Sequence, residues 1–77
     1  MNVTDTTKHY RTRAGEKVTV HEIVLKNAVG ENVTFPVKCS ILAQRKGARS
    51  RYAILRLDGK ASIFGDHHDD VIGYWEH

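Results

Sequence analysis

The sequence predicts an all-β domain, an antiparallel meander of five to six strands that forms a small barrel or sandwich. The first observation is negative: no stretch of helical length repeats apolar residues at intervals of three and four positions. The second is that residues 33–44 alternate, with apolar side chains at every odd position and mostly polar ones at the even positions. The third is the dipeptide Asp58-Gly59 between two strand-like runs, which is typical of a tight hairpin.

Six runs of residues have the composition of strands, and polar segments separate them. In the second run the apolar positions change phase at His21-Glu22, which predicts a β-bulge. In the third run Pro36 falls on the solvent face, which predicts a sheet edge or a bulge because proline donates no ladder hydrogen bond. The expected strands are residues 7–13, 17–25, 33–44, 51–57, 60–64 and 71–75, the last as a strand or a docked tail.

The runs near the C-terminus carry two more detailed expectations. Residues 51–57 have apolar side chains on both faces, which favours a central strand. Asp58 and Gly59 favour a type I′ turn, in which both residues have positive φ. This turn would lead into a return strand over residues 60–64.

The chain of 77 residues is expected to form one domain, with residues 1–7 as a flexible N-terminus and residues 8–77 as a single β domain. The single cysteine, Cys39, excludes a disulfide within the chain and favours a buried thiol in a reducing cytoplasm over a reactive one. No apolar run is long enough to span a membrane, and residues 1–7 lack the apolar core of a secretory signal. We therefore expect a cytoplasmic protein with no membrane partner.

Charges are distributed unevenly along the chain. All 12 lysines and arginines precede residue 61 and share that part with five acids, whereas residues 61–77, the acidic tail, carry four acids and no lysine or arginine. The acidic tail either neutralises the basic part within the fold or pairs with it between subunits, which leaves a homodimer open. A third interpretation is a basic face for nucleic acid or for an acidic protein.

The strongest candidate for a binding site is the basic loop (residues 45–51), which places four cations around a glycine between two predicted strands. A hairpin tip presents its side chains from a rigid base; the alternative is a solvated tip with no partner. For a nucleic acid, the basic surface would extend over Arg11, Arg13 and Lys38. The aromatic residues suited to stack on bases are Tyr10, Tyr52 and Trp75, but no helix-turn-helix, zinc-finger or RNP motif is present. The expected partner-binding residues are Arg45, Lys46, Arg49, Arg51, Tyr52 and Lys38.

The acidic tail holds two further candidates. Residues 66–70 (Asp-His-His-Asp-Asp), together with His77, offer metal ligands. Adjacent histidines in an extended segment point in opposite directions, however, and share an ion only in a tight turn. We therefore expect a polar loop whose aspartates cap a turn, with no metal and no other cofactor. Tyr74 and Trp75, together with Ile72, either close the core or form a dimer interface, because tyrosine and tryptophan are enriched at interface hot spots.

Three short motifs resemble a family of small accessory proteins of tailed bacteriophages. They are residues 10–18 (Tyr-Arg-Thr-Arg-Ala-Gly-Glu-Lys-Val), the Phe-Pro-Val step at residues 35–37, and Leu-Asp-Gly-Lys at residues 57–60. In that family a Tyr-x-Thr-Arg-x-Gly-x-x-Val start precedes a strand, an aromatic-Pro-Val step and an Asp-Gly hairpin. The resemblance covers roughly residues 10–70 and implies a small, β-rich protein without an assigned activity. It brings no catalytic residues with it.

These features lead to one functional expectation. The chain is a non-enzymatic phage accessory protein of the host-cell cytoplasm that binds a host or phage protein through the basic loop and the sheet edge near Pro36. The alternative is a small β domain that binds nucleic acid. An enzyme is not expected, because the sequence has no Gly-rich phosphate loop and no Gly-x-Ser-x-Gly motif.

Overall fold

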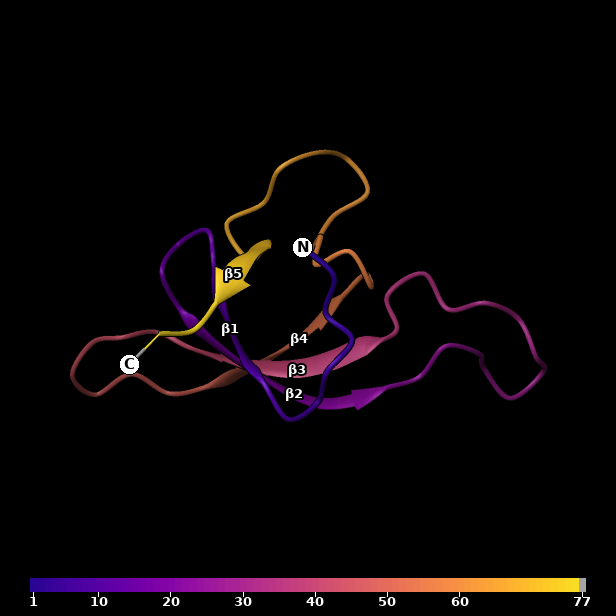
Figure 1. The fold of residues 1–77 in the computed structure, drawn as a ribbon, viewed down its shortest axis with the longest axis horizontal. Helices are drawn as coiled ribbons and strands as arrows, with labels where there is room; N and C mark the ends of the chain where they lie inside the picture. Colours follow the sequence, from indigo (N-terminus) through magenta and orange to yellow (C-terminus); the bar gives the residue numbers. More distant parts are fainter. Residues whose placement is uncertain (77) are drawn as a thin grey trace.

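The computed structural model describes residues 1–76 and confirms the all-β prediction. All five strands belong to one antiparallel sheet with the order β4-β3-β2-β1-β5 (Figure 1). Among these residues no helix forms, and accordingly none is long and apolar enough to cross a membrane. The strands are β1 (His9–Thr12), β2 (Lys17–Ile23), β3 (Val37–Leu42), β4 (Arg51–Leu55) and β5 (Val71–Tyr74).

The first four strands form a meander, and β5 departs from it. Each of β1 to β4 pairs with the next strand along the chain, but β5 pairs with β1. The connection over residues 56–70 therefore leads from one edge of the sheet to the other and arches above it in Figure 1. Val71 N–H donates to the carbonyl oxygen of Gly59 at 2.9 Å, which ties this connection to the start of β5. Within residues 1–76, β4 and β5 do not pair with each other, so the sheet is not closed into a barrel.

The core lies on one face of the sheet, and the alternation read from the sequence produces it. Val37, Cys39 and Ile41 of β3 are fully buried, whereas Lys38 and Leu42 between and after them are exposed. Successive side chains of a strand point to opposite faces, so one face can be apolar while the other stays polar. The buried apolar residues that complete this core are Val3, Tyr10, Val18, Val20, Leu55 and Val71.

The predicted bulge in the second strand is confirmed. Val20 pairs with Cys39, but the next pair along the ladder joins Glu22 to Lys38, so His21 is an extra residue with no partner of its own. The insertion restores the apolar phase of β2 and leaves His21 and Glu22 exposed on the outer face of the sheet.

Two predictions about strand position are wrong. Pro36 is buried rather than on the solvent face, and it directly precedes β3, which lies between β2 and β4 and has no free edge. Residues 51–57 do not form a central strand. Among residues 1–76, β4 pairs only with β3, and β5 joins the sheet beside β1 instead. The strand β4 is instead an edge strand, and its outward side chains Tyr52 and Ile54 are 87% and 55% exposed.

The expected hairpin after β4 also differs. Gly59 has φ of 85°, but among residues 1–76 only glycines have positive φ, so Asp58-Gly59 does not form a type I′ turn. Arg56 N–H donates to Lys60 O at 2.8 Å, and the pairing stops there. Residues 60–64 form no return strand, and Phe64 is 92% exposed.

The two ends of the domain both contact the rest of the fold. The last predicted segment, residues 71–75, forms the strand β5 over most of its length. For residues 1–7, Val3 is fully buried and its N–H donates to Leu57 O at 2.7 Å, while the flexibility of this segment stays a prediction.

Candidate functional site

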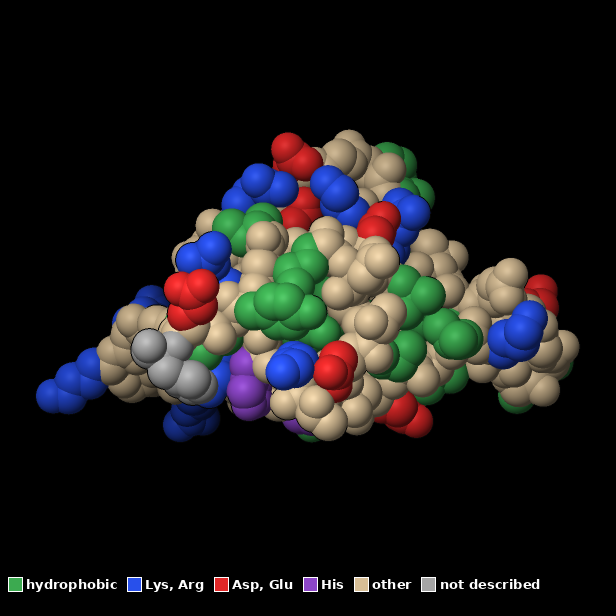
Figure 2. Space-filling view, in the orientation of Figure 1, with side chains coloured by type: hydrophobic (Ala, Val, Ile, Leu, Met, Phe, Trp, Pro, Cys, Tyr) green, Lys and Arg blue, Asp and Glu red, His purple; other side chains and the backbone are tan. Residues whose placement is uncertain are grey.

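The basic loop is the connection between β3 and β4, two adjacent antiparallel strands. A turn closes it: Ala48 N–H donates to Arg45 O at 3.2 Å, and Gly47 has φ of 79°. Three of its cations, Arg45, Lys46 and Arg49, are exposed and form no ion pair with any residue from 1 to 76. Figure 2 shows lysine and arginine side chains projecting at the left-hand end of the molecule, where Figure 1 draws the connection between β3 and β4.

The fourth cation of the basic loop, Arg51, is held by two carboxylates instead. Its guanidinium donates to both carboxylate oxygens of Glu16, at 2.9 and 3.2 Å, and to Asp69 Oδ1 at 2.6 Å. The hydrogen bonds from Arg51 lower the pKa of Glu16, and those to Glu16 and Asp69 raise the pKa of Arg51. Arg51 therefore links the start of β2, the start of β4 and the acidic tail, and only the other three cations are free to extend into solvent.

Tyr52 and Lys38 lie on the outer face of the sheet, opposite the core. The Tyr52 ring is next to the His21 ring, with centroids 5.9 Å apart, and His21 Nε2 lies 2.6 Å from Ser40 Oγ. A groove of about 490 Å³ runs between these side chains and ends at the free edge of β4. We call it the outer groove; its lining residues are His21, Glu22, Lys38, Tyr52, Ala53 and Ile54.

Sequence reasoning missed His21 and Ile54 as parts of this surface, although both left a signal. The phase change that predicts the bulge also predicts that His21 leaves the ladder, and the apolar outward residue Ile54 was read as evidence for a central strand. An apolar side chain on the outer face of an edge strand is equally consistent with a contact surface.

The acidic tail pairs with three cations of the basic part within the fold, which agrees in part with one of the alternatives that the sequence allows. Arg13 lies 3.6 Å from Asp70 and 3.7 Å from Asp66, and Lys60 lies 3.4 Å from Asp66. With the Arg51–Asp69 pair, three of the tail's four acids have a cationic partner in the same chain.

Asp70 organises the acidic tail from inside. Its side chain is 2% exposed and accepts the backbone N–H groups of Ala61 at 2.8 Å and of His67 at 2.9 Å. Burial works to raise the pKa of Asp70, but these two hydrogen bonds, with Lys60 and Arg13 nearby, outweigh it and hold the pKa below its ordinary value. The expectation that an aspartate of residues 66–70 caps a turn is thus confirmed.

Tyr74 and Trp75 lie at the other edge of the sheet from β4. Tyr74 stacks on the buried Tyr10 with ring centroids 5.3 Å apart, and Lys17 Nζ lies 6.0 Å from the centroid of a Trp75 ring. Trp75 N–H donates to His9 O at 3.0 Å. Both aromatic residues therefore pack against the fold, and Tyr74, about half exposed, also offers a surface to a partner.

Cys39 is buried, as predicted. Its side chain is fully enclosed between β2 and β4, and burial, with Asp69 nearby, raises its pKa to about 11. A thiol in this environment stays protonated at neutral pH and is a poor nucleophile.

Comparisons with protein-family models, curated proteins and solved structures find no match to this chain. The resemblance to phage accessory proteins therefore stays a prediction. The function has to be inferred from the contacts, charges and exposed surfaces of the molecule itself.

Proposed function

We propose that this chain is a non-enzymatic binding protein that engages an acidic protein through the basic loop and the free edge of β4. The observation that carries the proposal is that the three unpaired cations of the basic loop lie just before an edge strand with exposed apolar side chains. Following the resemblance, the partner is a host or phage protein in the cytoplasm of the infected cell.

The edge of β4 supplies the main-chain part of this contact. An edge strand has a row of N–H and C=O groups with no partner on its outer side, and an extended peptide can pair with them as an added strand. Every second side chain of such a peptide would lie over Tyr52 and Ile54, on the same face as the outer groove. This edge replaces the one expected near Pro36.

The basic loop supplies the electrostatic part. Unpaired surface cations attract acidic partners over about 10 Å at ordinary ionic strength, and they affect the association rate more than the final affinity. A partner with acidic residues beyond the end of its added strand would place them beside Arg45, Lys46 and Arg49.

Single-stranded nucleic acid is the second candidate, and the exposed Tyr52 ring is the observation that favours it. Tyr52 is 87% exposed beside His21, with Lys38 in the same groove. An open aromatic face next to cations is the arrangement on which bases stack while phosphates pair.

Two pairs of charge reversals of equal size test the proposal. Arg45→Glu with Arg49→Glu changes the basic loop, and Lys8→Glu with Lys26→Glu makes the same change in net charge elsewhere. In an affinity capture from host lysate, the first pair should remove the specific partner and the second should retain it. If both pairs retain the same proteins, the role of the basic loop is wrong.

A third variant, Ile54→Lys, tests the edge, because a lysine on an edge strand opposes strand addition. It should lower retention of the same partner that the basic-loop variant loses.

Titration with oligothymidylate at increasing salt concentrations separates the two candidates. Nucleic acid would be favoured by tight binding whose log K falls by about 0.7 per phosphate contact for each log unit of salt.

A further inference from the structure

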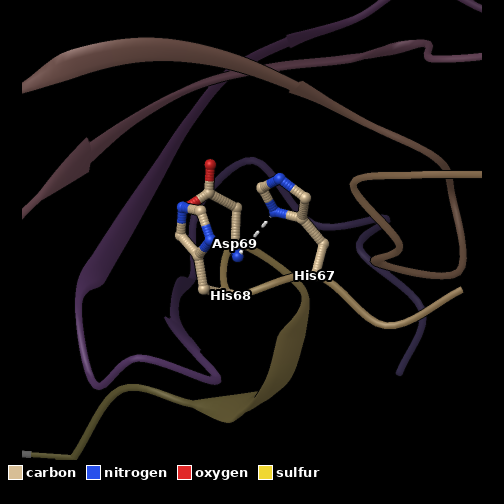
Figure 3. Close-up of side chains that lie close together, drawn as sticks. All are labelled: His67, His68 and Asp69. Carbon is tan, nitrogen blue, oxygen red and sulfur yellow. Dashed lines mark hydrogen bonds and ion pairs between the residues drawn. The ribbon is translucent and has the colours of Figure 1, made fainter.

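Three metal-ligating side chains meet in the acidic tail, in a segment that we call the histidine turn (His67, His68 and Asp69; Figure 3). One ligand atom from each residue lies within 4.8 Å of the others, and the two imidazole rings stack with centroids 4.2 Å apart. A tight turn brings them together, with Asp70 N–H donating to His67 O at 3.0 Å. We propose that the histidine turn binds a divalent transition-metal ion.

The backbone of the histidine turn is held in place by a residue that is not a ligand. The buried Asp70 carboxylate accepts the N–H of His67 with one oxygen and that of Ala61 with the other. The turn is thus anchored to the preceding part of the connection before any metal arrives. A site built on an anchored backbone loses less conformational entropy on binding than one on a free loop.

The ligand atoms lie farther apart than they would around a bound ion, but small side-chain rotations would bring them to the required distance. Zinc–nitrogen and zinc–oxygen bonds of about 2.0–2.2 Å in a tetrahedron put neighbouring ligand atoms about 3.4 Å apart. His68 is exposed and His67 partly so, which leaves the two rings room to rotate towards Asp69, whose carboxylate Arg51 holds at 2.6 Å. His67 Nδ1 accepts the N–H of Asp69 at 3.0 Å. Ligation through Nδ1 replaces this hydrogen bond, and ligation through Nε2 moves the ring proton to Nδ1, which also breaks it.

Local charge favours a cation despite the nearby arginine. Arg51 contacts Asp69 Oδ1, but the same guanidinium is paired at two points with Glu16. The three groups together carry one negative charge, and the second oxygen of Asp69 has no hydrogen-bond partner among residues 1–76. Arg51 therefore orients the carboxylate from outside the coordination sphere, as outer partners of metal ligands commonly do.

The donor set defines the class of metal. Two imidazoles and one carboxylate suit Zn²⁺, Co²⁺, Ni²⁺ or Cu²⁺, whereas Mg²⁺ and Ca²⁺ prefer oxygen ligands alone. Three protein donors leave at least one position for water.

Calorimetric titration of the tag-free chain with ZnCl₂ tests the proposal, which is independent of the proposed partner binding. We expect one ion per chain, and His67→Ala or His68→Ala should each lower the affinity at least about 10-fold. His21→Ala, a histidine on the sheet, is the matched control and should leave the affinity unchanged. Circular dichroism establishes that each variant retains its β structure. Equal affinity in all three variants would overturn the site.

A second measurement needs no variant. Substoichiometric NiCl₂ should broaden the ring proton signals of His67 and His68 in the NMR spectrum and spare those of His9 and His21. Broadening centred on His9 or His21 would assign the metal to the sheet and overturn the proposal. Equal binding of MgCl₂ would contradict the imidazole-based selectivity.

Discussion

The two connections on either side of β4 are both polar and highly charged, yet the structure uses them differently. In the connection after β4 (residues 56–70), the carboxylates pair with cations of the same chain and accept backbone N–H groups. In the basic loop before β4, three cations have no ionic partner among the described residues. A dense run of charge is therefore structural in one place and presented to solvent in the other.

The difference follows from where each connection must go. Residues 56–70 cross from one sheet edge to the other and cover the core on the way, so their charged groups meet backbone donors that need acceptors. The basic loop joins two neighbouring strands and extends beyond the sheet, where water satisfies its polar groups. Only the first kind of charge is expected to contribute to stability.

The largest difference between the two connections should come from their glycines. Gly59 and Gly47 have nearly equal φ, 85° and 79°, but a Cβ added at Gly59 would lie 3.1 Å from Val71 Cβ, whereas one at Gly47 meets nothing within 4 Å. We expect Gly59→Ala to lower the free energy of unfolding by about 2–3 kcal/mol and Gly47→Ala by about 1 kcal/mol. Urea denaturation measures both; equal losses would show that steric contact at Gly59 contributes nothing.

The buried carboxylate should give the next largest effect. Asp70→Asn keeps the shape of the side chain but removes a charged acceptor of two backbone N–H groups. We therefore expect it to lower the free energy of unfolding by about 2 kcal/mol. Asp66→Asn, at a side chain that is 73% exposed, should cost less than about 0.5 kcal/mol. Thermal unfolding at pH 7 checks both, and a loss of 1 kcal/mol corresponds to a shift of about 4–8 °C.

The same carboxylate predicts a pH dependence. The pKa of Asp70 is lower in the folded protein than in the unfolded chain, so its contribution is fully present above the unfolded value of about 3.9. It is lost as the pH falls through the folded pKa. Between pH 7 and 3 the wild type should therefore lose more stability than Asp70→Asn; equal losses in the two proteins would contradict this assignment.

A smaller difference in stability is expected between variants of Arg51 and Arg49, two arginines of the basic loop that the sequence alone does not distinguish. Arg51→Gln removes the link between Glu16 and Asp69, and because the Arg51 side chain is 42% exposed we expect a loss of only about 0.5–1 kcal/mol. Arg49→Gln removes no such link and should leave the stability unchanged. Chemical denaturation of the two variants side by side tests this, and an equal effect would mean that Arg51 belongs functionally with the free cations.

The smallest effect is expected for the basic loop as a whole. Arg45→Glu with Arg49→Glu should change the free energy of unfolding by less than about 0.5 kcal/mol, because neither side chain has an ionic partner among residues 1–76. The same variant is the one predicted to lose the partner. A marked loss of stability would show that the basic loop is structural, like the connection after β4.

The predictions that depend on the residues of a single strand were confirmed. The alternation over residues 33–44 predicted which side chains of β3 are buried, and the phase change in β2 predicted its bulge at His21. Cys39 was placed correctly for the same reason. In each case the period of two follows from the backbone of a single strand, whatever its neighbours are.

Predictions that depend on neighbouring strands were less successful. Residues 51–57 were expected to be central and residues 60–64 to pair with them, but β5 pairs with β1 at the opposite edge, and Ala61 N–H donates to the Asp70 side chain. For the candidate site, the basic loop was located from the sequence, whereas the pairing of Arg51 with Glu16 and Asp69 joins residues up to 35 positions apart. No local pattern carries that information.

The sequence alone determines that this chain forms strands, which faces of them are apolar, and where its charges lie along the chain. Only the tertiary structure decides which charges are used within the fold and which are left free. The physical reason is that an ion pair or a strand edge depends on which elements become neighbours, and the long connection that brings β5 to β1 sets those neighbours. That connection leaves β4 at an edge of the sheet, directly after the basic loop and with no strand on its other side among the described residues.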